Sequence, residues 1–261
     1  MNVGSTDHWL SPLRERALLP AGTLAAFVVG SAARGWHNAR SDFDIYVVSE
    51  DAESVAGGGM PLRPNPPQLH TVDFYDENRK WEITYWTQSQ VDQALAKVAW
   101  PVFESGDSAG DTLTLYEELL LARLDTCIPV VGDAWIQLSR RRLAESAFSA
   151  RVVVRSLGAA DDAVEDALGQ LEAGDLESAT ISARVAFRHV VDALLESYGE
   201  YGSHLLKWQP NRVRAVAPAE IGFSDYWRIE TMQGYDIRNP GPWIVNVLTL
   251  SQDLAMRVHT A

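Results

Sequence analysis

The chain has 261 residues, of which 46% are hydrophobic, and its formal net charge at pH 7 is -13. This length suffices for one large domain or two small ones. The acidic balance disfavours a long nucleic acid as the main partner, because duplex binding depends on clustered Lys and Arg side chains. The one cysteine, Cys127, excludes a disulfide within the chain, and its apolar neighbours predict a buried, inert thiol.

The first residues, MNVGSTDHWLSPLRER, do not follow the pattern of a secretory signal peptide, which places a basic stretch before a long apolar one. No apolar run approaches the length that a membrane span requires. From these two observations we expect a soluble, cytoplasmic protein.

Short β-type runs lie in the first third of the chain, which also contains a dense cluster of glycines and prolines at 57–67. A short helix is expected at 12–19, and buried strands are expected at 24–30 and 43–48. The stretch GGGMPLRPNPPQ at 57–68 predicts irregular structure, because its glycines are flexible and its prolines lack an amide donor. Two further β-type runs, 69–76 and 80–87, predict a hairpin that turns at 77–79.

After residue 87 the pattern becomes helical. A helix is expected to begin at the cap candidate Ser89. Another is expected from the cap Asp175 to Gly199, and the long amphipathic stretch before it is expected to break near Gly158. The sequence therefore predicts an α+β protein, in which a small mixed-sheet domain at 1–100 is followed by a helical bundle at 101–261.

The most informative stretch is VVGSAARGWHNARSDFDIYVV, which runs from 28 to 48. Gly30 and Ser31 form a small-residue turn between a strand and a short helix, where exposed N–H groups can bind an anion. Asp42 and Asp44 are two residues apart at the next strand, so both side chains share one face of the sheet. Two carboxylates held together in this way favour a bound cation, and hard oxygen ligands suit magnesium.

Two further side chains extend this candidate site. Arg34, in the first turn of the helix, can add a fork of donors to a bound phosphate. A third carboxylate commonly completes a two-metal site, and Glu82 in KWEITYW is the preferred candidate because an unpaired acid within a strand is costly if buried. Asp73, on the partner strand of the hairpin, is its rival.

The stretch GSAARGWHNARSDFDIYVV resembles the signature of the DNA-polymerase-β-like nucleotidyltransferase superfamily, and within it the kanamycin- and lincosamide-type antibiotic enzymes and the minimal nucleotidyltransferases. The resemblance covers about the first third of the chain. It implies that Gly30 and Ser31 bind the phosphates of a nucleotide, that Asp42 and Asp44 bind Mg²⁺, and that Glu82 matches the third acid. The helical half resembles the C-terminal bundles of these enzymes only in its helical sequence pattern.

The helical half supplies further candidates. Lys207 lies in SHLLKWQPNRVRA, a basic segment with Arg212 and Arg214, and is expected either to contact the triphosphate or to be solvated. The acceptor hydroxyl needs a base, and the acids at the junction between the two halves are candidates. These acids are Glu104, Asp107, Glu117 and Glu118, and Glu117 is our choice among them.

The sequence thus predicts a magnesium-dependent nucleotidyltransferase. It would transfer a nucleoside monophosphate, AMP from ATP or another nucleotide, to a hydroxyl of a small and cationic acceptor such as an antibiotic, and release pyrophosphate. One alternative is an antitoxin-like nucleotidyltransferase that modifies a protein or an RNA end. Another is a nucleotide-binding regulator without turnover. The sequence does not identify the acceptor, the preferred nucleotide or the oligomeric state.

Overall fold

The computed structural model describes residues 6–50, 58–106 and 113–259. The chain divides into two compact units, Met1–Ala147 and Phe148–Ala261. Among the described residues, no helix has the length and apolar character that crossing a membrane requires.

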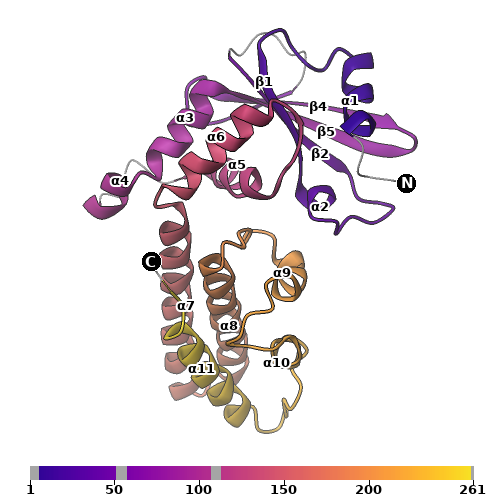
Figure 1. Ribbon diagram of the computed structural model, residues 1–261. Helices are drawn as coiled ribbons and strands as arrows, with labels where there is room; N and C mark the ends of the chain where they lie inside the picture. The colour runs from indigo at the N-terminus through magenta and orange to yellow at the C-terminus, as the bar shows by residue number, and fades with distance from the viewer. Residues whose placement is uncertain (1–5, 51–57, 107–112, 260–261) are drawn as a thin grey trace. The chain divides into compact units, whose positions relative to one another are not determined.

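The first unit is built on a six-stranded sheet with strand order β3-β4-β5-β2-β1-β6. The strands are β1 (Thr23–Val29), β2 (Phe43–Ser49), β3 (Gly58–Pro61), β4 (Gln68–Asp76), β5 (Arg79–Thr87) and β6 (Ile128–Val131). The pair β2–β5 is parallel and the other neighbouring pairs are antiparallel. The expected mixed sheet is confirmed, and its parallel pair lies at the centre (Figure 1).

One face of this sheet packs against helix α1 (Thr6–Glu15). Phe43, Ile45 and Val47 alternate along β2 into this core, and Trp9 and Leu13 of α1 cover them. All five side chains are at most 7% exposed. Their burial fixes the register of β2, because a shift by one residue would move this apolar set to the other face. The residues between them, including Asp44, therefore point to the opposite face.

Two local expectations were wrong, and one strand was not foreseen. The stretch at 57–68 is not irregular throughout, because Gly58–Pro61 pairs with Gln68–Thr71 as an edge strand, where a proline that ends the strand is tolerated. Strand β6 was not expected. Helix α3 (Gln88–Lys97) is capped by Thr87 rather than Ser89, because the Thr87 side chain and Gln90 form a reciprocal capping box. By contrast, the hairpin is confirmed, and its two turn residues Glu77 and Asn78 have φ of 47° and 62°.

The first unit extends past the boundary expected at residues 100 and 101, to Ala147. It includes α4 (Trp100–Ser105), α5 (Leu115–Thr126) and α6 (Asp133–Ala144). Strand β6 pairs with β1, and Trp135 of α6 donates a hydrogen bond of 2.6 Å to Gln88 of α3. At Gly132, which has φ of +81°, a Cβ would lie 2.9 Å from Cα of Ala25, so only glycine allows this close approach to β1.

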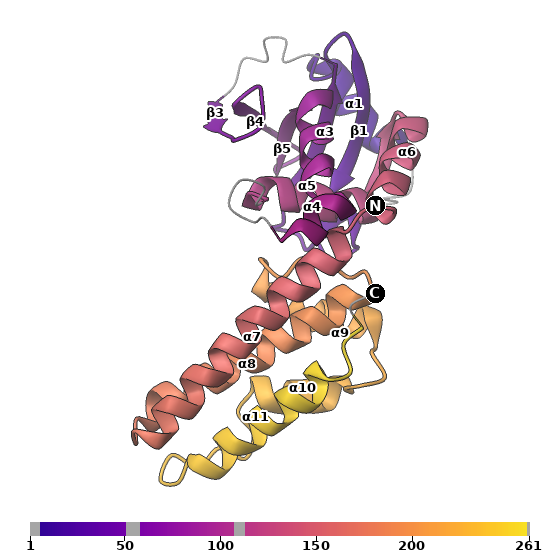
Figure 2. The same ribbon diagram turned by 90° about the vertical axis from the view of Figure 1, so that its left-hand side faces the viewer.

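The second unit is helical. It contains α7 (Phe148–Glu172), α8 (Leu176–Ser197), the short 3₁₀ helix η1 (Leu206–Trp208), α9 (Gln209–Val216), α10 (Phe223–Glu230) and α11 (Gly241–Ala255). Helices α7 and α8 lie side by side along their length (Figure 2). Helix α7 passes Gly158 without a break, contrary to expectation. The Asp175 cap is confirmed, since its Oδ1 accepts a hydrogen bond of 3.1 Å from the Ser178 amide.

A network of charged side chains is buried inside the second unit. Arg212 donates to Asp192 at 2.5 Å and to the carbonyl of Glu200 at 2.6 Å. Glu196, which is 1% exposed, accepts a hydrogen bond of 2.7 Å from Ser156. Burial raises the pKa of Glu196 from 4.5 to about 7. The hydrogen bond from Ser156 opposes this shift, and the neighbouring charge of Asp192 adds to it.

We expect the free energy of unfolding to fall as the pH rises from about 5 to about 7. In that range the unfolded chain loses the Glu196 proton while the folded chain keeps it, so folded stability decreases by roughly 1–3 kcal/mol. Replacing this residue (Glu196→Gln) should remove that part of the slope, as measured by urea unfolding across the pH range. The exposed acid Glu165 on α7 gives the control, Glu165→Gln, and a slope identical in all three proteins would contradict the assignment.

Candidate functional site

The turn at Gly30 and Ser31 lies directly against Asp44. Strand β1 ends at Val29, which is the register partner of Asp44 in β2. Gly30 has φ of +67°, and a Cβ at this position would lie 3.4 Å from Cγ of Asp44 and collide with its Oδ2. Only glycine fits here, both because of the backbone conformation and because of the carboxylate. The following helix α2 (Gly30–Ala33) has four residues, so its dipole is that of a single turn.

Acidic side chains form a row across three neighbouring strands. Asp44 on β2 is the register partner of Glu82 on β5, and Glu82 is the partner of Asp73 on β4. Register partners share a face, and neighbouring strands are about 4.8 Å apart. Asp44 is therefore about 5 Å from Glu82 and about 10 Å from Asp73, measured between backbones. Asp42, one residue before β2, extends the row by the two-residue period of the strand.

Lys80 lies among these acids. Its ammonium is 3.5 Å from Oε2 of Glu82 and 3.8 Å from Oδ2 of Asp73. Burial lowers the pKa of Lys80, but Asp73, Glu82 and Asp42 raise it by more, so the net shift is upward. The sequence interpretation missed this lysine, although its position two residues before Glu82 on the same strand places both side chains on one face.

Arg123 of α5 is a second cation on this face that the sequence did not indicate. Its Nη1 donates a hydrogen bond of 2.6 Å to the hydroxyl of Tyr46, which follows Asp44 by two residues on β2. Burial lowers the pKa of Arg123, but the net shift is upward because Tyr46, Asp44 and Glu82 favour its charge. No local motif marks Arg123, since it reaches the acids only through the packing of α5.

The donor set of this face is compatible with magnesium. Carboxylate oxygens are the ligands that Mg²⁺ prefers, commonly one or two from the protein together with substrate phosphates. The side chain of Glu82 is 42% exposed and that of Asp73 is 61% exposed, and the ammonium of Lys80 lies within 4 Å of both, so the face already stabilises positive charge. Within residues 6–50, 58–106 and 113–259, no three His, Cys, Asp or Glu side chains already converge as a metal site would require, so a bound phosphate would have to complete the set of ligands.

The remaining nucleotide-binding candidates lie in different surroundings. The guanidinium of Arg34 lies 4.1 Å from the ring centroid of Trp36. Lys207 belongs to η1 in the second unit, with its ammonium 5.4 Å from the ring centroid of Trp208. The basic segment around Lys207 is not a uniform solvated face, because Arg212 is 1% exposed and pairs with Asp192.

Glu117 is buried and has a structural role at the start of α5. Its side chain is 0% exposed, and its Oε1 lies 2.7 Å from the ammonium of Lys97. Its Oε2 accepts a hydrogen bond of 2.7 Å from the Thr114 amide, as part of the capping box that begins α5. These contacts argue against the expected role as general base, because an enclosed and paired carboxylate cannot reach an acceptor hydroxyl. Another base candidate, Asp107, lies outside the described residues.

The environment of Cys127 agrees with the expectation of an inert thiol. The residue is 5% exposed. Burial raises the pKa of its thiol to about 11, with a smaller opposing effect of Arg140. At neutral pH the group therefore stays protonated, which is the unreactive form.

Comparison with known proteins identifies the first unit. Residues 13–105 match the model of the family described as "Nucleotidyltransferase domain". This match defines the class of the domain: residues 13–105 form a nucleotidyltransferase domain, and the reaction of such domains is the transfer of a nucleoside monophosphate. The domain belongs to the polymerase-β-like superfamily, which confirms the resemblance drawn from the Gly-Ser and Asp-x-Asp motifs.

Among solved structures, the chain is similar to a nucleotidyltransferase-like protein from Exiguobacterium sibiricum 255-15, with 10% sequence identity and a TM-score of 0.49. That similarity covers 97% of this chain and 74% of the other. No curated protein matched the sequence.

Proposed function

We propose that the chain is a magnesium-dependent enzyme that transfers AMP from ATP to a hydroxyl of a small molecule and releases pyrophosphate. The observation that carries this proposal is the packing of the Gly30 turn on Asp44, in register with Glu82. It brings a backbone able to bind phosphate and a set of hard carboxylate ligands to one point, which is what nucleotidyl transfer requires.

In this proposal each residue has a separate task. Asp42 and Asp44 would hold the magnesium, with Glu82 as third acid, and the ion would neutralise charge on the attacking and leaving oxygens. Gly30 and Ser31 bind the phosphates through their backbone, and Arg34 adds donors. The acceptor hydroxyl releases its proton to solvent, its oxygen forms a bond to the α-phosphorus, and the bond between that phosphorus and pyrophosphate breaks. Arg123 holds Tyr46 and adds positive charge behind Asp44, and we assign it a positioning role.

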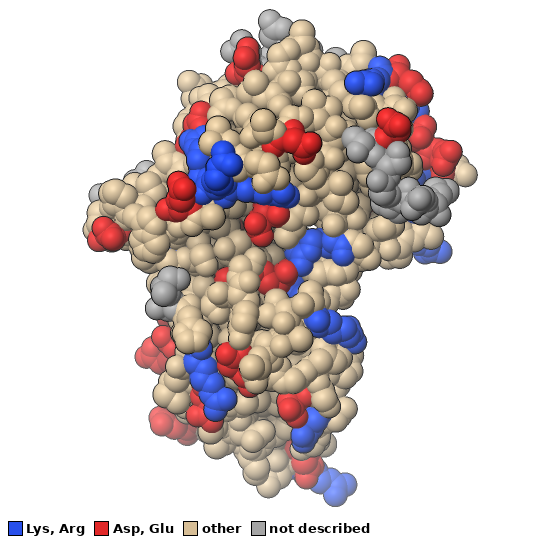
Figure 3. Space-filling view, viewed as in Figure 1, with Lys and Arg blue, Asp and Glu red and all other residues tan. Residues whose placement is uncertain are grey.

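The charge of the site favours a cationic acceptor. Glu82 and Asp73 are both substantially exposed, with Lys80 as their common partner, so a positively charged acceptor would be attracted. On the face seen in Figure 3, Lys and Arg side chains lie among Asp and Glu side chains and form no continuous basic surface over the described residues. This distribution favours a small acceptor rather than a long nucleic acid, because a long nucleic acid requires clustered Lys and Arg side chains.

The experiment that tests this function is a screen for pyrophosphate release. The full chain is incubated with Mg²⁺, each of the four ribonucleoside triphosphates, and a panel of cationic hydroxylated antibiotics, proteins and RNA ends. Release with ATP and a small cationic acceptor is expected. Release only with a protein or RNA acceptor would support an antitoxin-like enzyme. Nucleotide binding without pyrophosphate release under any condition would support a nucleotide-binding regulator without turnover. Either of these last two results would contradict the proposal.

The third carboxylate can be distinguished by a matched pair of variants. Glu82→Gln is expected to lower kcat at least tenfold more than Asp73→Asn, because Glu82 is one strand from Asp44 whereas Asp73 is two strands away. Steady-state rates at saturating Mg²⁺ and ATP measure the difference. Both variants remove a contact to Lys80, so the comparison cancels that effect. The opposite order would assign the third position to Asp73.

Lys207 remains a proposed contributor to nucleotide binding. Lys207→Ala is expected to weaken ATP binding about threefold to tenfold, because a lysine is a point-charge donor suited to the outer phosphates. A titration of ATP against the full chain measures this, with Arg257→Ala at an exposed position of the same unit as the control. Unchanged affinity in Lys207→Ala would show that Lys207 is a solvated surface residue.

A further inference from the structure

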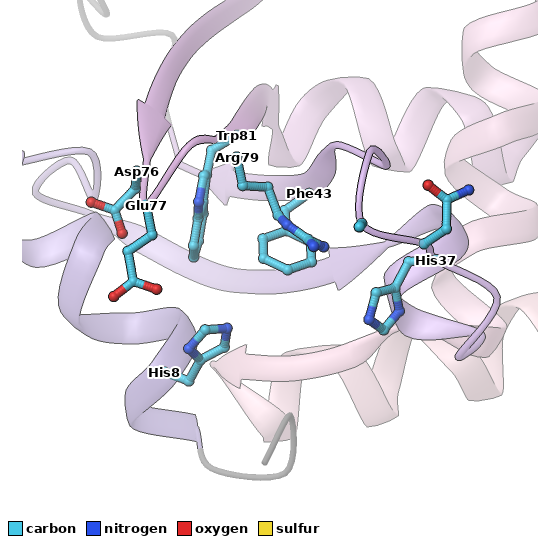
Figure 4. Close-up of a pocket in the computed structure, with 9 residues that line it drawn as sticks. His8, His37, Phe43, Asp76, Glu77, Arg79 and Trp81 are labelled. Atoms are coloured by element: carbon cyan, nitrogen blue, oxygen red, sulfur yellow. The ribbon is translucent and has the colours of Figure 1, made fainter. Parts of the chain in front are cut away.

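The first unit contains a cavity of about 410 Å³ that is separate from the row of acids. It lies at the beginning of β2 and β5, between α1 and the loop that precedes β2 (Figure 4). Phe43 and Trp81 form part of its lining and are register partners in the parallel pair. Because side chains alternate along a strand, these two point to the face opposite Asp44 and Glu82.

Aromatic rings line this cavity. The rings of Phe43 and Trp81 are 5.3 Å apart and nearly perpendicular. The His8 ring from α1 lies 6.1 Å from Phe43 and 6.2 Å from Trp81, and the His37 ring lies 6.0 Å from Phe43. Flat rings at these angles offer both faces and edges to a bound aromatic group. The volume is also within the range of small-molecule sites.

A positively charged side chain on the cavity wall has a buried donor without a partner among the residues that the structure describes. The guanidinium of Arg79 lies 4.4 Å from the Phe43 ring centroid, and in Figure 4 it is directed toward the side that carries His37. Among the described residues, no acceptor pairs with the buried Nη1 of Arg79 or with the buried Nδ1 of His37. Buried donors without a partner cost free energy that a bound anion would recover.

The two acids of the lining do not cancel this charge. Asp76 is the register partner of Arg79, but its carboxylate pairs with Arg16, which donates a hydrogen bond of 2.7 Å to Oδ1. Glu77 lies in the turn between β4 and β5 and, in Figure 4, on the side of the cavity away from His37. The end of the cavity near Arg79 and His37 consequently favours a negative group, while the end near Trp81 favours an apolar ring.

We propose that this cavity is a second ligand site, which binds a small aromatic carboxylate. The carboxylate pairs with Arg79 and accepts a hydrogen bond from His37, and the ring packs against Phe43 and Trp81. The site does not depend on the proposed acceptor or nucleotide, because it lies on the other face of the sheet.

The test compares two probes that share one ring, indole-3-carboxylate and indole-3-carboxamide. Isothermal titration of the full chain is expected to show binding of the carboxylate, with the neutral amide at least tenfold weaker. Arg79→Gln should reduce carboxylate affinity at least tenfold, whereas Arg63→Gln, at an exposed arginine of the same unit, should leave it unchanged. Saturating Mg²⁺-ATP should not displace the carboxylate.

Four results would overturn the proposal. They are equal affinity for the two probes or no binding of the carboxylate, undiminished affinity in Arg79→Gln, and displacement by Mg²⁺-ATP, which would make the cavity part of the nucleotide site. If circular dichroism shows that Arg79→Gln is unfolded, His37→Gln replaces it. That variant should lower carboxylate affinity severalfold, and wild-type affinity would contradict the role of His37 and the site with it.

Discussion

Asp44→Asn is expected to lower kcat/KM for nucleotidyl transfer at least about 1000-fold, equivalent to about 4 kcal/mol of transition-state stabilisation. Asparagine keeps the size of the side chain but removes the negative charge that holds the metal, and charge stabilisation by the metal is a large part of catalysis in this reaction class. The apolar neighbours Phe43 and Ile45, which form the core, are unchanged, so the fold should persist. Pyrophosphate release at saturating Mg²⁺ measures the effect.

A matched variant separates this loss from a general effect of removing an acid. Asp125→Asn changes an exposed aspartate of α5 in the same unit and should retain the wild-type rate. Circular dichroism and thermal unfolding should show all three proteins folded. A folded Asp44→Asn protein with near-normal turnover would remove Asp44 from the site, whatever the role of Asp42.

Gly30→Ala is expected to lower kcat/KM about 100-fold and to destabilise the fold by roughly 1–3 kcal/mol. Two effects add at this position: φ of +67° is strained for alanine, and the new methyl group would collide with the Asp44 carboxylate. The collision must displace either the turn or Asp44, and both belong to the proposed site. Steady-state kinetics together with urea unfolding measure the two effects.

The chain offers a close control for the backbone part of this effect. Gly35 has φ of +66°, but a Cβ there would have no atom within 4 Å. Gly35→Ala should therefore lose only the part of the stability that comes from backbone strain, and it should keep its activity. If both variants lost activity equally, the close packing of Gly30 on Asp44 would not be the cause.

The strands around the site could be predicted from the sequence because their burial patterns are strong. Phe43, Ile45 and Val47 alternate with more polar residues, and that alternation alone places Asp42 and Asp44 on the other face. The register between β2 and β5 could not be predicted in this way, because it joins segments that are far apart in the chain. The alignment of Asp44 with Glu82, and of Glu82 with Asp73, therefore becomes visible only in the folded sheet.

Other features were missed for identifiable reasons. Strand β6 has four residues and contains Pro129, and it is a strand only because it pairs with β1. This pairing also explains why the first unit continues past residue 100. The capping role of Glu117 was readable, since a threonine three residues before a glutamate is the pattern of a capping box. Arg123 had no such signal, because its contact with Tyr46 spans 77 residues of sequence.

The central claim is that Asp42 and Asp44, beside the Gly30 turn, carry out nucleotidyl transfer. The most direct measurement follows label from ATP into the acceptor that the pyrophosphate screen identifies, with ATP labelled either at the α- or at the γ-phosphate. We predict that α-label enters the product in the wild-type protein, that γ-label leaves as pyrophosphate, and that Asp42→Asn abolishes transfer. Transfer of γ-label to the acceptor, or α-label transfer at the wild-type rate in folded Asp42→Asn, would contradict the central claim.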